Sequence, residues 1–272
     1  MINKKHINIL SILFVLLLSS CYTYNIPSGA TTPLITKEGE FKVSANGNFN
    51  EIGGNFTYGL TKHVVFSSSG NYIIRKNDYK QDYDSLFLKK TPNNFEIAFG
   101  YFGSKKKFAN MFLFGVGAGN NTFYHKKNDY FQNGYYVSQY YQANYIQYFL
   151  QYTAGFKFIK QKYHHIKYRE LGISLRYAYH DYYVDGIVEQ EITDYTEDEN
   201  NINSSYKTYE QDVFNSFTVY YFYRTGNDRI QFEISPGFSF YDKTPNYEAQ
   251  FTSSKIHFNV GIVFNVNNFF LN

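Results

Sequence analysis

The feature that most constrains the fold of this 272-residue chain is a strict alternation of apolar and polar residues along many short stretches. In residues 256–266, isoleucine, phenylalanine or valine occupies every second position, and residues 230–240 repeat the pattern. Successive side chains of a β-strand point to opposite faces, so a period of two over this length predicts strand. No comparable helical period occurs after residue 20. The chain is therefore predicted to be all-β.

Ten stretches carry this alternation with varying strength, and each is expected to cross a hydrocarbon core as a tilted strand, which takes about 9 to 11 residues. They are residues 41–49, 52–60, 64–75, 95–101, 111–122, 142–158, 171–180, 213–224, 230–240 and 256–266. An even number of strands joined in sequence returns both ends of the chain to the same side.

The connections between these stretches alternate in length. Those predicted to be short turns are residues 61–63, 103–108, 159–167 and 225–228. The others are a tight turn near 48–51, long loops at 76–94, 124–141 and 183–212, and a medium loop at 242–253. Short periplasmic turns with longer outer loops are typical of outer-membrane barrels. By this resemblance residues 37–272 are predicted to form a closed antiparallel transmembrane β-barrel of about ten strands.

A soluble β-sandwich or lipocalin-like barrel would show the same alternation with its apolar faces turned inward. The polar faces favour the membrane barrel, because they are rich in Gly, Ser, Asn and Thr with few charges of either sign. A solvated sheet face would carry more Lys and Glu. The charges on these faces are predicted to form a polar network facing the lumen: Lys42, Arg75, Glu96, Lys157, Arg176 and Glu233.

The first residues indicate export. Lys4 and Lys5 precede an apolar stretch, residues 7–18, that is too short to span a bilayer. The stretch ends in Leu18-Ser19-Ser20-Cys21, which resembles the lipobox of bacterial lipoproteins. That resemblance implies a signal peptide at 1–20, lipidation of Cys21, and a lipidated tether at 21–36. By analogy, the Tyr22-Thr23-Tyr24-Asn25 that follows favours an anchor on the periplasmic side of the outer membrane of a Gram-negative-type bacterium.

Composition excludes several classes of protein. Aromatic residues make up 21% of the chain, with 30 Tyr, 28 Phe and no Trp, and Tyr is favoured at membrane interfaces. A mean hydropathy of −0.45 excludes a bundle of membrane-spanning helices. A net charge of +3 without a long basic run argues against nucleic-acid binding. Because Cys21 is the only cysteine, an intramolecular disulfide is excluded.

Sites for chemistry are scarce in this sequence, and no cofactor or metal is expected. His164 and His165 have no carboxylate nearby in the sequence to complete a metal site. His180 shares a strand face with Ser174, but six residues of strand separate them by about 20 Å, which excludes a dyad. Residues 183–211 carry eight carboxylates and one lysine, which fits a solubilising loop or a loop that collects cations. Glycines at 115, 117 and 119 are expected to make room in the lumen for bulky residues such as Phe149.

Together these features favour a non-enzymatic outer-membrane β-barrel lipoprotein with a structural or surface-interaction role, or a narrow passive channel. Its expected partners are outer-membrane lipids and the barrel-assembly and lipoprotein-export machineries. The first alternative is a soluble lipid-anchored binding module, a β-barrel or sandwich on the periplasmic face. The second is a lipid-modifying barrel enzyme.

Overall fold

The computed structural model describes residues 32–48, 51–73, 79–81, 84–129, 135–162, 165–192, 203–242 and 256–270. The elements are β1 (Phe41–Gly47), β2 (Glu51–Gly59), β3 (Val64–Ile73), β4 (Tyr79–Gln81), β5 (Asp84–Lys105), β6 (Phe108–Asp129), β7 (Tyr135–Lys162), β8 (His165–Ile192), β9 (Asn203–Gly226), β10 (Ile230–Tyr241), β11 (Ile256–Asn265) and the short helix α2 (Asn267–Phe270).

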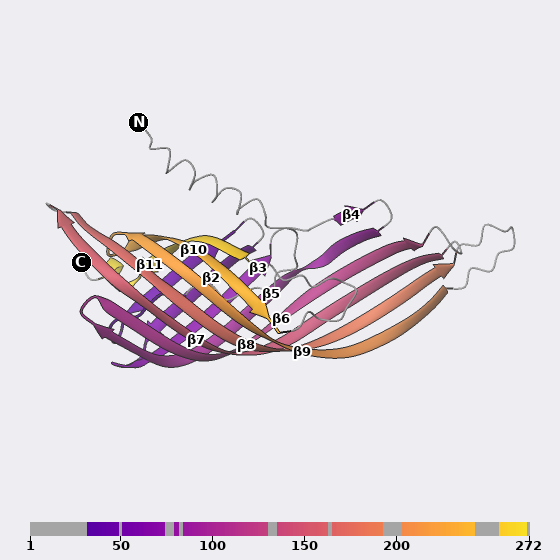
Figure 1. Ribbon diagram of the computed structural model, residues 1–272, viewed down its shortest axis with the longest axis horizontal. Coiled ribbons are helices and arrows are strands. Elements are labelled where there is room, and N and C mark those ends of the chain that lie inside the picture. Colours follow the sequence, from indigo (N-terminus) through magenta and orange to yellow (C-terminus); the bar gives the residue numbers. More distant parts are fainter. Residues whose placement is uncertain are drawn as a thin grey trace, which may run out of the picture.

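Ten of the strands form a closed antiparallel barrel (Figure 1). Each barrel strand pairs with the barrel strand next to it in sequence, and pairing of β1 with β11 completes the ring. β3 pairs with β5 from Val64↔Tyr101 to Tyr72↔Asn93, while the short β4 pairs with the far part of β5. The predicted fold class is confirmed, and each of the ten predicted strand stretches overlaps one of these ten strands.

The apolar faces of the strands point outward. Phe95 and Phe99 are more than half exposed, whereas Glu96 between them is buried with its side chain inside the barrel. The same division holds around the ring: Phe114, Leu171, Phe232 and Val260 are exposed, and the polar residues that alternate with them are buried. An apolar exterior around a polar interior is the pattern of a membrane-spanning barrel. A soluble barrel would show the opposite arrangement, so the facing argues against that alternative.

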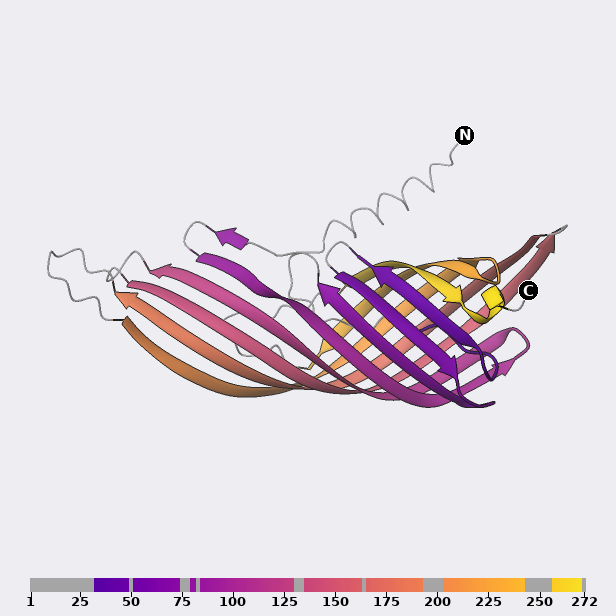
Figure 2. The same ribbon diagram turned by 180° about the vertical axis from the view of Figure 1, so that it is seen from behind.

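Five neighbouring strands continue far beyond the others. β5 to β9 are 22 to 28 residues long and extend as a curved sheet past one end of the barrel (Figures 1 and 2). Much of what was predicted as long loops is therefore strand, namely residues 84–94, 124–129, 135–141, 183–192 and 203–212. That prediction was wrong because the hydrogen-bonded ladder continues where the alternation of side chains fades. The tip of the acidic stretch, residues 193–202, lies outside the described residues.

The opposite end of the barrel carries the short hairpin turns, and we call it the turn end. The other end is called the long-strand end. Lys105 pairs with Phe108, which leaves a two-residue turn in which Lys106 adopts a positive φ of 54°. Two-residue hairpins favour this left-handed conformation because it matches the twist of the strands. The turn between β2 and β3 and the turn between β9 and β10 lie close to their predicted positions, while β7 and β8 extend further than predicted, to Lys162 and from His165.

The C-terminal segment fastens the last strand to the first. β11 ends at Asn265, and α2 follows at once. The side chain of Asn267 accepts a hydrogen bond from the backbone N–H of Phe41 and donates one to the carbonyl of Gly39 at 2.8 Å. Among the described residues there is no helix of sufficient length and apolarity to traverse a bilayer.

Candidate functional site: a filled lumen

Inside the barrel lies a stretch of the chain's own N-terminal region, Thr32–Thr36. Thr32 is buried, and Leu34 and Ile35 have no exposed surface at all. The sequence assigned these residues to the tether, with no indication that they enter the lumen. Three uncharged residues in a row, Pro33-Leu34-Ile35, allow this burial because they bring no charge into the barrel. We refer to Thr32–Thr36 as the inserted segment.

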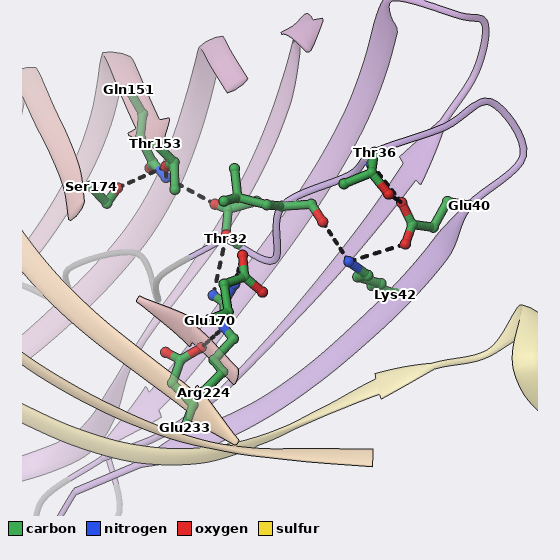
Figure 3. A network of polar contacts seen from close by, with 11 residues as sticks. Thr32, Thr36, Glu40, Lys42, Gln151, Thr153, Glu170, Ser174, Arg224 and Glu233 are labelled. Atoms are coloured by element: carbon green, nitrogen blue, oxygen red, sulfur yellow. Dashed lines mark hydrogen bonds and ion pairs between the residues drawn. The ribbon is translucent and has the colours of Figure 1, made fainter. Parts of the chain in front are cut away.

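Side chains of the barrel wall hold the inserted segment through polar contacts at two depths (Figure 3). At the deeper point, Gln151 Nε2 donates to Thr32 Oγ1 at 2.9 Å, and Arg224 Nη2 donates to the Thr32 carbonyl at 3.4 Å. Nearer the turn end, Lys42 Nζ donates to the Leu34 carbonyl at 2.5 Å. Buried carbonyls that accept from charged donors are favourable contacts, so the segment is specifically bound and does not merely fill space.

Two glycines of the wall let the inserted segment approach closely. A Cβ atom on Gly59 would lie 2.6 Å from the carbonyl oxygen of Lys37 and 3.0 Å from Ile35 Cγ2. One on Gly155 would lie 3.0 Å from Leu34 Cδ1. The lumen is therefore shaped around this segment at both positions.

The inserted segment runs from the middle of the lumen toward the turn end. Gly39 donates a backbone hydrogen bond to Gly59, the last residue of β2, so the chain leaves the segment at the turn end. Thr32 instead contacts Gln151, which pairs with Leu113, five residues inside β6. Five residues of strand correspond to roughly 17 Å along its length. Thr32 is thus the deepest described residue of the segment.

A compact ion cluster surrounds the inserted segment on one side. Arg224 is almost completely buried between two carboxylates, with Nε 2.6 Å from Glu233 Oε2 and Nη1 3.4 Å from Glu170 Oε1. Its guanidinium carbon also lies 4.3 Å from the centre of the Phe222 ring. A buried arginine needs such partners, because an unpaired charge inside the barrel would be very costly.

A second ion pair closes the turn end. Lys42 Nζ lies 3.1 Å from Glu40 Oε1, and Glu40 Oε2 accepts from the backbone N–H and the hydroxyl of Thr36. Burial by itself would raise the pKa of Glu40, which precedes β1. The positive charges of Lys42 and Lys157 and the hydrogen bonds from Thr36 outweigh burial and lower this pKa to about 2. Glu40 is therefore ionised at neutral pH and fixes the end of the inserted segment.

Above Thr32 a polar network joins four strands, β3, β5, β7 and β8, on one side of the lumen. Arg176 donates two hydrogen bonds to the Glu96 carboxylate, of 3.0 and 2.7 Å. Ser69 and Gln147 donate to the same carboxylate, and Asn94 donates to it from the same strand. The guanidinium carbon of Arg176 lies 3.8 Å from the centre of the Phe149 ring. The space between this network and Thr32 is a cavity of about 10 Å³, which is room for about one water molecule.

The glycines of β6 make that network possible. A Cβ on Gly115 would lie 2.3 Å from the Phe149 ring, and one on Gly117 would lie within 2.8 Å of both Gln147 and Glu96. These alternate glycines face the lumen and leave space for large side chains from the neighbouring strands. This is the role that their spacing in the sequence suggested.

A Ser-His-acid triad is not assembled around Ser174 or His180 among the described residues. Ser174 shares a hydrogen bond of 2.9 Å with Thr153, and His180 Nε2 instead lies 2.8 Å from Ser216 Oγ. The other ring nitrogen of His180 has no hydrogen-bond partner in this part of the chain, so no acid orients the ring as in a triad. Groups of three or more His, Cys, Asp or Glu side chains that could hold a metal are likewise absent from the residues described.

The residues predicted to face the lumen fall into three groups. Lys42, Glu96, Arg176 and Glu233 are buried inside the barrel, in three separate ion pairs. Lys157 is half-buried, and it is close enough to Glu40 for its positive charge to lower the pKa of that carboxylate. Arg75 and Cys21 lie outside the described residues. Sequence reasoning missed Arg224, Glu170 and Glu40. The first two could have been found, because both stand at polar positions of the apolar–polar alternation, which continues to the ends of their strands.

No protein-family model matches the sequence, and no curated protein matches it. Among solved structures, the chain is similar to a loop L8 deletion mutant of OmpT, an outer membrane protein of Vibrio cholerae. The identity is 8%, the match covers 83% of this chain and 97% of that chain, and the TM-score is 0.17. A likeness this weak carries no argument, and the architecture rests on the strand pairing itself.

Proposed function

We propose that this chain is a non-enzymatic β-barrel lipoprotein of the bacterial outer membrane, inserted through its strands and lipidated at Cys21. The observation that carries the proposal is an apolar exterior combined with a filled lumen. Exposed aromatic and aliphatic residues suit contact with lipid, while the inserted segment and the three buried ion pairs leave little room for a solute. This combination favours a structural or surface-interaction role over a passive channel.

The long-strand end supports a role at the cell surface. β7 and β8 are each 28 residues long, against the 9 to 11 residues that a tilted strand needs to cross the hydrocarbon core. With the short turns on the periplasmic side, the extended part of β5 to β9 projects outward from the membrane. Such a sheet offers a large surface to partners outside the cell. Insertion by the barrel-assembly machinery and delivery by the lipoprotein-export machinery remain parts of this proposal.

Two measurements test the proposal against its alternatives. In one, the chain with Cys21→Ser is expressed behind an ordinary secretory signal peptide. It should stay in the membrane and migrate anomalously in detergent gels unless boiled, because the strands hold it there. Release as a water-soluble protein would favour the lipid-anchored binding module. In the other, purified protein is added to planar bilayers, where small conductances or none are expected; large stable channels would favour a porin.

A further inference from the structure

The inserted segment raises the question of how the chain that precedes Thr32 leaves the barrel. Toward the turn end the lumen is already occupied. Leu34 and Ile35 are completely buried there, and the Lys42–Glu40 pair closes the remaining side. A chain returning past its own inserted segment would have to separate these buried contacts, which carry charge and therefore cannot be left unpaired.

Toward the long-strand end the wall offers polar groups. His180 Nδ1 and Ser235 Oγ are buried and have no hydrogen-bond partner in the part of the chain that the structure describes. His180 pairs with Gln147, four residues from Gln151 in the direction of the long-strand end. Ser235 pairs with Asn259, whose side chain binds Asn48 beside the β1–β2 connection at that end. Both positions lie beyond Thr32 along the lumen and can hydrogen-bond a passing backbone.

We propose that the long-strand half of the lumen is the docking site for the chain immediately before Thr32, and that the lipid on Cys21 lies at the long-strand end. This rests on the proposed function for the lipid and for the barrel. It replaces the periplasmic anchor that the sequence suggested by analogy. With short turns in the periplasm, the anchor belongs to the outer leaflet.

The length of the chain allows this route. Eleven residue steps separate Cys21 from Thr32, and an extended chain of that length spans at most about 36 to 40 Å. The apolar band of such barrels is about 25 Å tall, and Thr32 lies near its middle. The chain therefore needs to cover only about half the band to emerge at the opposite face. The two ends of the stretch from Cys21 to Phe41 then lie on opposite sides of the membrane.

Two variants that each add one cysteine test the route in intact cells, because the thiol of a lipidated Cys21 is not free to react. Thr23→Cys places a thiol beside the anchor, and Glu38→Cys places one at the exposed turn end. A membrane-impermeant maleimide is applied to intact and to permeabilised cells. We expect Thr23→Cys to be labelled on intact cells and Glu38→Cys only after permeabilisation.

Other labelling patterns overturn the inference. If both thiols react only after permeabilisation, the anchor is periplasmic; if both react on intact cells, the two positions are not on opposite faces. A Thr23→Cys thiol that reacts only after unfolding would also contradict the proposal. Heat-modifiable migration of both variants is checked in the same samples, so that failure of the barrel itself is recognised separately from failure of the route.

Discussion

Arg176 on β8 binds Glu96 on β5 with both ends of its guanidinium group, at 3.0 and 2.7 Å, across the two strands that separate them in the sheet. Both side chains are buried, so this pair joins non-adjacent strands inside the barrel. The contact therefore constrains the cross-section of the barrel at a level where backbone pairing links only neighbours.

Arg176→Ala should destabilise the barrel by about 3 to 5 kcal/mol, because the Glu96 carboxylate then stays buried without its counterion. The double variant Glu96→Gln with Arg176→Met should recover much of this loss, since no buried charge remains. The free energy of unfolding by guanidinium in detergent micelles gives the comparison. If the double variant is no more stable than Arg176→Ala, the unpaired charge of Glu96 is not the cause of the lost stability.

Val260 tests the orientation of the strands. Its side chain is about half exposed on the outer surface of β11, where we expect hydrocarbon. Val260→Arg should cost about 2 to 4 kcal/mol near the midplane of the bilayer. Val260→Ile is the control and should behave like the unmodified chain. Unfolding from lipid vesicles measures both, and equal stability of the two variants would argue against a lipid-facing position.

Gly59 should be critical for docking of the inserted segment. In Gly59→Ala the new methyl group would press on the Lys37 carbonyl and on Ile35, so the segment must shift. Gly54→Ala is a matched control on the same strand, because its Cβ would meet only the Ser44 carbonyl at an ordinary 3.6 Å. We expect trypsin to cleave after Lys37 faster in Gly59→Ala than in Gly54→Ala. Mass spectrometry of the fragments measures the two cleavage rates. Identical cleavage rates in the two variants would contradict the close fit.

The strands and their facing could be predicted because a bilayer imposes a simple pattern. Where hydrocarbon lies outside and polar side chains lie inside, each strand alternates, as residues 256–266 and 230–240 do. Beyond the membrane this requirement ends. Residues 183–192 are strand although their acidic residues suggested a loop, because backbone pairing with β7 and β9 continues there.

The filling of the lumen was only partly predictable. Glu96 and Arg176 stand out as charges within alternating strands, but the pattern cannot show which charges meet, since pairing depends on strand tilt and side-chain length. The inserted segment gave no signal, because Pro33-Leu34-Ile35 is too short to have a period. Its position is set by long-range contacts to Gln151, Arg224 and Lys42.

Glu40 predicts an acid sensitivity for the turn end. Its pKa in the folded barrel is about 2, below the ordinary value of 4.5, so the folded state favours the ionised carboxylate. A lowered pKa contributes stability that is complete above pH 4.5 and is lost as the pH falls toward 2. The lowering corresponds to about 3 kcal/mol as an order of magnitude. Because loss of other ion pairs also contributes to acid unfolding of a protein, the contribution of Glu40 must be isolated by comparison.

Glu40→Gln provides that comparison, because it keeps the shape of the side chain and removes the titration. The variant should be less stable than the unmodified chain at pH 6, and the difference should shrink as the pH falls from 4.5 toward 2. Glu38→Gln, two residues earlier and exposed, should follow the unmodified chain throughout. Guanidinium unfolding in micelles across this range supplies the measurement. A constant difference between Glu40→Gln and the unmodified chain at every pH would show that ionisation of Glu40 does not stabilise the folded barrel.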